Sequence, residues 1–383
     1  MRAERPISAL YFAVMLTGAY IAAGLFEFPR EIVTEAGPEA AWSFLVECGA
    51  ALFGLWLWFQ VNHLYPDEQV GGFVSRIVTP FLGWPLRAFT IMTHTLLAVW
   101  VTANFGLVMI TFFLPDTPLW ALEALTVLVA LYMAWIDTRV LGRTIQVLFL
   151  PTGILSVLLA LLLLPRLTQM WAVAPTVDVH LATIAYAAYK GYYLFWGYEV
   201  TVTLYPFVAH SARRQAERYA YIAMVLAAAF FAFGYVLVMG AGGPYLVMAA
   251  QWPGVSTMRL ITLTSFLINK LGLFVVMLWS LFVFIFVAMR IWCLGQDLRP
   301  ALNLTSIQSY RWMLVGACAA TLGVSQLFTN ITVLNGFFNH WVTPAMVVFN
   351  FGVPPVLLLG AAITRARARR GGARAPSSPP SAS

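Results

Sequence analysis

The chain has 383 residues, of which 61% are hydrophobic and 10% are charged, and its mean hydropathy is +0.82. About a quarter of the residues in an ordinary soluble domain are charged, so this composition predicts an integral membrane protein. The net charge of +7 comes from bases spread over the predicted loops and the C-terminal end, a pattern that indicates membrane topology and argues against nucleic-acid binding.

The sequence can be read as about ten apolar runs joined by short connections, since a hydrocarbon core of roughly 30 Å needs about 20 apolar residues per helix. We therefore predict an all-α bundle of about ten transmembrane helices. The predicted spans, in order, are 7–28, 39–61, 85–114, 118–136, 144–164, 181–208, 219–241, 270–294, 310–328 and 341–364.

Three connecting or terminal segments carry predictions of their own. Residues 71–84 alternate apolar and small polar side chains and are expected to form a short interfacial helix. Residues 242–269 contain two Gly/Pro pairs and are expected to form a structured re-entrant or lid-like loop. Residues 1–364 are predicted to form a single bundle, followed by a disordered basic and Pro/Ser-rich tail over 365–383.

Lysine and arginine favour cytoplasmic loops. With the N-terminus inside, the predicted spans place 17 arginines, Arg290 among them, on the inner side, and Arg30, Arg166 and Arg259 on the outer side. This asymmetry predicts that both termini are cytoplasmic.

The spans divide into two halves, 7–164 and 181–364, and the first span of each half is interrupted by glycines. Gly18 and Gly24 are six residues apart, as are Gly191 and Gly197, and an acid, Glu27 or Glu199, follows each second glycine. In transporters built from two inverted five-helix halves, each half starts with a broken helix and the substrate binds near the two breaks. The alternative is that the glycines only allow close helix packing.

A helix that breaks at mid-membrane offers free N–H groups to a carboxylate and free carbonyls to an ammonium group or a cation. An amino acid carries both groups, so we predict an amino acid site between the first and sixth spans, lined by the third and eighth. The predicted ligand-binding residues are Gly18, Tyr20, Ala23, Gly24, His94, Asn104, Tyr193, Phe195, Trp196, Gly197 and Glu199.

Several charged or polar residues have more than one interpretation. Glu199 either pairs with a charge or gates the site, or it makes a structural hydrogen bond. Lys190 either pairs with an acid or with a ligand carboxylate, or it snorkels to the membrane surface. Glu27 is expected to be a solvated gate residue at the outer edge. His94 with Asn104 is either a proton relay or pocket lining, or a satisfied buried histidine. Glu47 and Glu123 are expected to be packing or interfacial groups rather than proton carriers.

The sequence shows no motif of a common enzyme class or metal site. Its three cysteines, Cys48, Cys293 and Cys318, lie in or beside apolar runs without metal-ligand spacing, so we expect free buried thiols. We predict no enzymatic activity, no cofactor and no metal.

Two sequence runs resemble a known family. Residues 195–199 (Phe-Trp-Gly-Tyr-Glu) with 204–207 (Leu-Tyr-Pro-Phe), together with 23–29 (Ala-Gly-Leu-Phe-Glu-Phe-Pro), resemble the spore germination permeases, the B subunits of nutrient germinant receptors. That family is similar to the amino acid, polyamine and organocation transporters of the LeuT-like fold. The resemblance covers about 7–363; the basic tail and Lys270, where an arginine is expected, depart from it.

The resemblance implies a germinant-sensing subunit of the spore inner membrane that works with an A-type and a C-type subunit on a small nutrient, most often an amino acid. An autonomous amino acid transporter coupled to protons or sodium is the alternative function. A structural scaffold for partner subunits is a third.

Overall fold

A computed structural model describes residues 6–69, 80–259 and 271–372. Within these ranges the regular secondary structure is helical, apart from an isolated parallel bridge between Ile7 and Val208, and turns or irregular segments join the helices. The predicted interfacial helix over 71–84 lies outside the described residues except for its last few, which belong to the next long helix. Lys270 also lies outside them.

The first half of the chain supplies five of the predicted spans. Its first span is split into two short helices, whereas the other four are continuous. The α-helices are α1 (Ala9–Gly18), α2 (Phe28–Ala36), α3 (Ala40–Leu64), α5 (Pro80–Phe112), α6 (Leu119–Ala134) and α7 (Thr138–Leu161). Ser8 and Asp137 cap α1 and α7, because their side chains accept hydrogen bonds from the backbone N–H groups of Tyr11 and Arg139.

The second half repeats this plan, since it also begins with a split helix. Its α-helices are α8 (Leu181–Gly191), α9 (Thr201–Leu204), α10 (Arg213–Ala249), α11 (Pro253–Met258), α12 (Leu271–Ala301), α13 (Ile307–Ser325), α14 (Ile331–Phe337), α15 (Thr343–Val347) and α16 (Val353–Gly372). Hereafter helix one denotes α1, α2 and the residues between them, and helix six denotes the segment from α8 to α9.

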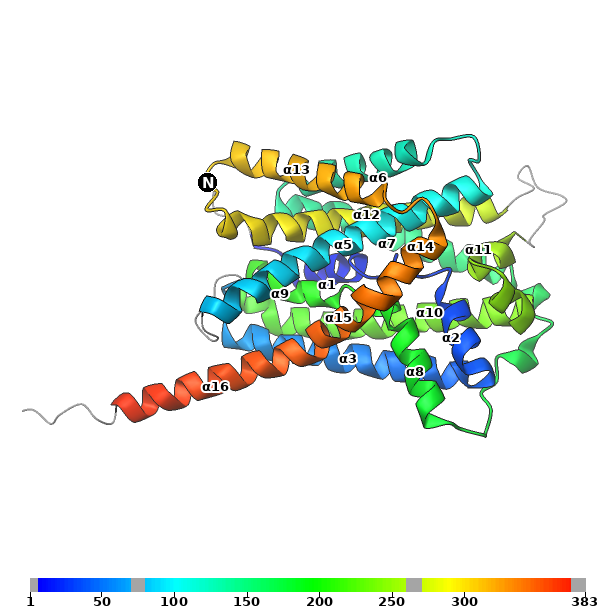
Figure 1. Ribbon diagram of the computed structural model, residues 1–383, viewed down its shortest axis with the longest axis horizontal. Coiled ribbons are helices and arrows are strands. Elements are labelled where there is room, and N and C mark those ends of the chain that lie inside the picture. The colour runs from blue at the N-terminus through cyan, green and yellow to red at the C-terminus, as the bar shows by residue number, and fades with distance from the viewer. Residues whose placement is uncertain (1–5, 70–79, 260–270, 373–383) are drawn as a thin grey trace, which may run out of the picture.

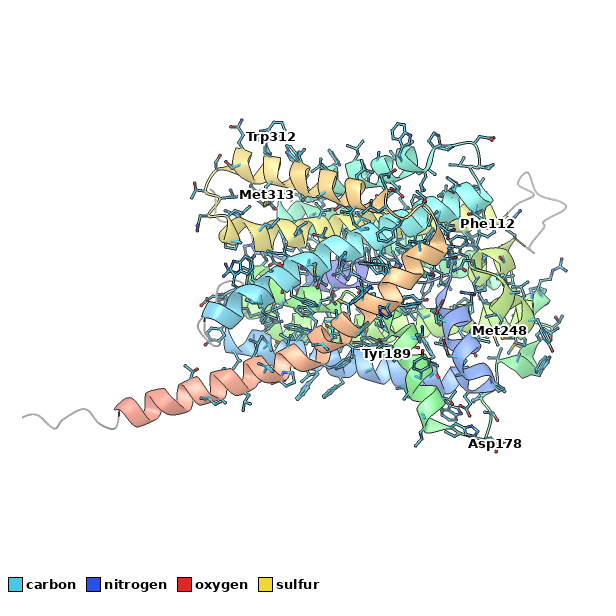
Figure 2. All side chains as sticks on the ribbon, viewed as in Figure 1. Phe112, Asp178, Tyr189, Met248, Trp312 and Met313 are labelled. Carbon is cyan, nitrogen blue, oxygen red and sulfur yellow. The ribbon has the colours of Figure 1, made fainter. Side chains whose placement is uncertain are left out.

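Six helices in the described ranges are long and apolar enough to cross a membrane, and α1 and α6 are shorter apolar helices. The helices run roughly along the long axis of the molecule (Figure 1), and α1 lies inside the bundle against α7 and α10. Phe112 and Met248 mark one end of the bundle, and Trp312 and Met313 mark the other (Figure 2). The prediction of an all-α membrane bundle is confirmed.

Several predicted boundaries were wrong, and three of them have a clear local reason. The seventh span continues through a kink at Gly243, where φ is 71°, to Ala249. The tenth begins at Ile331 rather than 341, because Asn330 caps α14 by accepting from the N–H of Thr332. Residues 365–372, predicted to be disordered, continue α16 beyond the bundle (Figure 1), since alternating alanine and arginine favour a helix.

The tenth span also contains two π-helical segments, η8 (Phe338–Val342) and η9 (Val348–Gly352). A π-segment inserts an extra residue into a turn, re-aims the side chains around it and is common at functional sites. The first of them, η8, lies where this helix passes the candidate site.

A polar contact near the membrane surface fixes the start of α8. Glu39 accepts hydrogen bonds from the backbone N–H of His180 at 3.0 Å and from its ring Nδ1 at 2.6 Å. The hydrogen bond and the charge of this carboxylate raise the pKa of His180. These contacts hold the first turn of α8 against Glu39, the residue directly before α3.

Candidate functional site

Helix one breaks between Gly18 and Phe28. Its α-helical bonding ends at Gly18, and Gly24 has a φ of 68°, which an L side chain rarely adopts. A Cβ atom at Gly24 would overlap the ring of Tyr193 from helix six. Glycine at this position therefore lets the two broken helices approach each other.

Helix six breaks around Gly197. After α8 the chain forms two 3₁₀ turns, η4 (Tyr192–Phe195) and η5 (Tyr198–Val200), separated at Gly197, whose φ is 142°. A Cβ atom at this glycine would overlap the carbonyl oxygen of Ala19 in the helix-one break. The two breaks thus face each other with backbone against backbone.

A buried ion pair joins the two breaks. Arg290 of α12 donates to Glu199 Oε1 at 2.7 Å and to the carbonyl oxygen of Ala19 at 3.2 Å, and Glu199 also accepts from the N–H of Gly197 at 2.8 Å. The side chains of Arg290 and Glu199 are 0% and 1% exposed. One guanidinium therefore binds a free carbonyl of helix one and the carboxylate of helix six.

His94 and Asp297 extend this cluster. Arg290 Nη1 lies 3.3 Å from His94 Nδ1, and His94 Nε2 lies 3.3 Å from Asp297 Oδ2. Thr203 of α9 donates to Asp297 at 3.3 Å. Helix one, helix six, α5 and α12 therefore share one buried polar cluster.

Glu27 lies in a second cluster on the opposite side of the break. Its carboxylate accepts from Trp252 Nε1 at 2.7 Å, and the same N–H lies 3.0 Å from Asn104 Oδ1. The N–H of Gly254 at the start of α11 donates to the carbonyl of Phe26 at 3.1 Å. The described part of the predicted lid-like loop therefore covers the helix-one break.

The two clusters separate residues that were predicted to act together. His94 contacts Arg290, whereas Asn104 contacts Trp252, although both lie on α5. Glu27 is 3% exposed, so the expectation of a solvated gate residue was wrong: the loop before α11 excludes solvent from it. Lys190 is half-buried, with Nζ 5.9 Å from the centre of the Tyr186 ring.

A small cavity lies between helix one, helix six, α5 and the tenth span. Its lining combines two acids with aromatic and amide side chains: Glu27, Glu31, Trp100, Tyr193, Trp196, Asn335, Phe338 and Asn339. The free space measures about 10 Å³, close to that needed by one water molecule. In this structure the cavity has room for no more than about one water molecule.

Three hydrogen-bond donors on the cavity wall have no hydrogen-bond partner among the described residues. They are Trp100 Nε1, Trp196 Nε1 and the hydroxyl of Tyr193. Buried polar groups are nearly always hydrogen-bonded, so three unpaired donors around one cavity need an explanation. A ligand with an acceptor group would supply it.

The predicted ligand-binding residues fall into three places. Tyr193 and Trp196 line the cavity; Gly24, Gly197 and Glu199 form the breaks beside it. Gly18 packs against Ile285, Tyr20 donates to Thr17 at 3.4 Å, and Phe195 packs against Phe44 and Phe231. Ala23 is buried beside Gly24.

Sequence reasoning missed several residues of both clusters. Arg290 was counted among the arginines of the inner side, but it lies inside α12 with no exposed surface. Trp100 and Phe338 were not among the predicted ligand-binding residues. An arginine flanked by apolar residues within a span was the one signal that pointed to the ion pair.

The family described as "Spore germination protein" matches residues 6–332 of this chain, whereas no curated protein sequence matches it. The chain also resembles the crystal structure of MhsT in complex with L-phenylalanine, with a TM-score of 0.67 and 12% sequence identity over 94% of this chain and 99% of MhsT. MhsT is a transporter of the LeuT-like fold, so this likeness identifies the fold of the present chain.

Proposed function

Because this chain belongs to the spore germination protein family, we propose that it is a nutrient-sensing membrane subunit of a spore germinant receptor. Its ligand is an amino acid that binds in the cavity between helix one and helix six. The observation that carries the proposal is the set of three unpaired donors, Trp100, Trp196 and Tyr193, in a cavity that also contains Glu27 and Glu31.

Each end of an amino acid has a chemical counterpart in this cavity. The indole N–H groups and the Tyr193 hydroxyl are donors for the ligand carboxylate. Glu27 and the ring faces of the aromatic side chains attract an ammonium group. The aromatic walls also favour an apolar side chain. The resemblance to a structure bound to L-phenylalanine is consistent with this class of ligand.

Binding requires the cavity to enlarge, because its present free space of about 10 Å³ is far too small for an amino acid. A ligand shifts a protein between two states only through differential affinity for them. We propose that the ligand stabilises a form in which helix six and the tenth span have moved apart, and that this change is the signal.

Membership of the family supports the remaining parts of the proposal. The chain acts in the spore inner membrane, with both termini cytoplasmic, and works with an A-type and a C-type receptor subunit. The excess of arginine on the predicted inner side supports this orientation, although Arg290 no longer contributes to that count.

A Tyr193→Phe variant tests the ligand site. We expect a screen of the common amino acids by thermal shift to identify a ligand that stabilises the purified protein. Loss of the Tyr193 hydroxyl then weakens its affinity by about tenfold, the value of one hydrogen bond to a charged group. Tyr186→Phe is the matched control, because Tyr186 is exposed. If Tyr193→Phe and Tyr186→Phe bind the ligand with equal affinity, the Tyr193 hydroxyl does not contact the ligand and the ligand site lies elsewhere.

Autonomous transport is the second candidate function, and the likeness to a transporter fold favours it. Uptake of the radiolabelled ligand into proteoliposomes that contain this chain alone separates the candidates. Concentrative uptake supports transport, and binding without flux supports sensing. A structural scaffold would show neither binding nor uptake.

The position of Arg290 bears on the coupling ion. Free carbonyls at helix breaks coordinate sodium in transporters with broken helices, but here Arg290 already donates to the Ala19 carbonyl and to Glu199. We therefore expect the affinity for the ligand to be the same, within about twofold, in NaCl and in KCl at equal ionic strength. A tenfold loss on replacing sodium by potassium would contradict this expectation.

A further inference from the structure

Glu47 is a buried acid that the proposed ligand site does not use. It lies in the membrane-spanning part of α3 and is 0% exposed, and neither of its carboxyl oxygens has a hydrogen-bond partner among the described residues. A charged carboxylate in such surroundings is strongly disfavoured unless it is paired. A group of this kind inside the membrane calls for a function.

Its position relates it to helix six. Gly191 is the last residue of α8, and a Cβ atom there would overlap Oε1 of Glu47. Ile32 of α2 lies at the same spot. The carboxyl group is therefore covered by the end of α8, at the point where helix six leaves the α-helical path.

The charged and titratable surroundings of Glu47 offer no counterion. No cationic side chain of the described residues lies within 4.0 Å of it. The titratable groups that interact electrostatically with it are Tyr192 and Tyr193 of helix six and Cys48, its neighbour on α3. None of these three carries a positive charge in any protonation state.

We infer that Glu47, expected from the sequence to be only a packing or interfacial group, is a proton-binding site whose occupancy is coupled to the position of α8. In the closed form, which has Gly191 over Glu47 as in this structure, the carboxyl group is a neutral acid. When α8 moves away from α3, water reaches the carboxyl group and the proton leaves. The inference does not rest on the proposed ligand or on its identity, because the evidence is the burial and surroundings of Glu47 alone.

Infrared spectroscopy of the full-length protein in lipid bilayers at pH 7 tests the protonation. The spectrum of wild type minus Glu47→Gln is expected to show the carbonyl stretch of a protonated carboxylic acid. Glu217→Gln is the matched control, because Glu217 pairs with His63 at 2.8 Å, and it should remove carboxylate bands instead. Carboxylate bands in the Glu47→Gln difference spectrum would overturn the inference.

The pH dependence of unfolding tests the coupling to the closed form. The folded protein holds this proton, whereas the unfolded chain releases it above its ordinary pKa of about 4.3. Above that pKa the folded protein therefore becomes less stable as pH rises. The unfolding equilibrium constant increases about tenfold per pH unit for as long as the folded protein keeps the proton. In Glu47→Gln the number of protons released on unfolding, which sets this slope, is expected to be smaller by one. Identical slopes in wild type and variant would show that Glu47 does not hold a proton in the folded state.

Discussion

Replacement of Glu199 by glutamine is expected to destabilise the folded protein by about 3–5 kcal/mol. The variant leaves Arg290, which has no exposed surface, without the carboxylate that binds it at 2.7 Å. The other contacts of the guanidinium, to the Ala19 carbonyl, the His94 ring and the Phe286 ring, carry no full negative charge. The loss is measurable as a lower midpoint of thermal or detergent-induced unfolding.

The matched control removes both charges. In a double variant, Glu199→Gln with Arg290→Met, no buried charge is left unpaired, so we expect it to be more stable than Glu199→Gln alone. This cycle distinguishes the cost of an unpaired arginine from the cost of altered packing. A double variant that loses the sum of the two single losses would show that the pair does not act as a unit.

Substitution of Gly197 by alanine is the second change with a large expected effect. The added Cβ atom meets a backbone carbonyl, that of Ala19, which cannot rotate away as a side chain does, and the φ of 142° is unfavourable for alanine. We expect a loss of at least about 2 kcal/mol in stability, together with the loss of ligand-induced thermal stabilisation, because the two breaks are forced apart.

Gly234→Ala in α10 is the control for this variant. No atom lies within 4 Å of a Cβ atom built at Gly234, and alanine favours a helix over glycine by about 1 kcal/mol. Its stability is therefore expected to be unchanged or slightly higher, with a normal response to the ligand. A folded Gly197→Ala protein with normal ligand affinity would exclude a site at the facing breaks.

The fold was predictable because its signals are local. Runs of about 20 apolar residues and glycines at equal spacing in two spans are visible in the sequence, and they predicted the bundle and its two broken helices. Boundaries failed where a local signal was ambiguous. Asn330, which caps α14, and the Ala/Arg repeat that extends α16 were interpreted as loop and tail.

The site was less predictable because it depends on pairs that are distant in the sequence. The partners Glu199 and Arg290 are 91 residues apart, and Glu27 and Trp252 are 225 apart. His94 and Asn104 were predicted to act together, but the sequence of one helix contains no information about which neighbouring residue meets each of them. The π-segment η8, which lines the cavity with Phe338 and Asn339, has no recognised sequence signature.

The backbone contact between the start of helix one and the end of helix six has a consequence for biosynthesis. Ile7 donates to the carbonyl of Phe207, 200 residues further along the chain, at 2.8 Å. At a synthesis rate of about 5–20 residues per second, the first span waits roughly 10–40 s for this partner. Helix one therefore enters the membrane before the residues that hold its break exist, and the two breaks assemble late in folding.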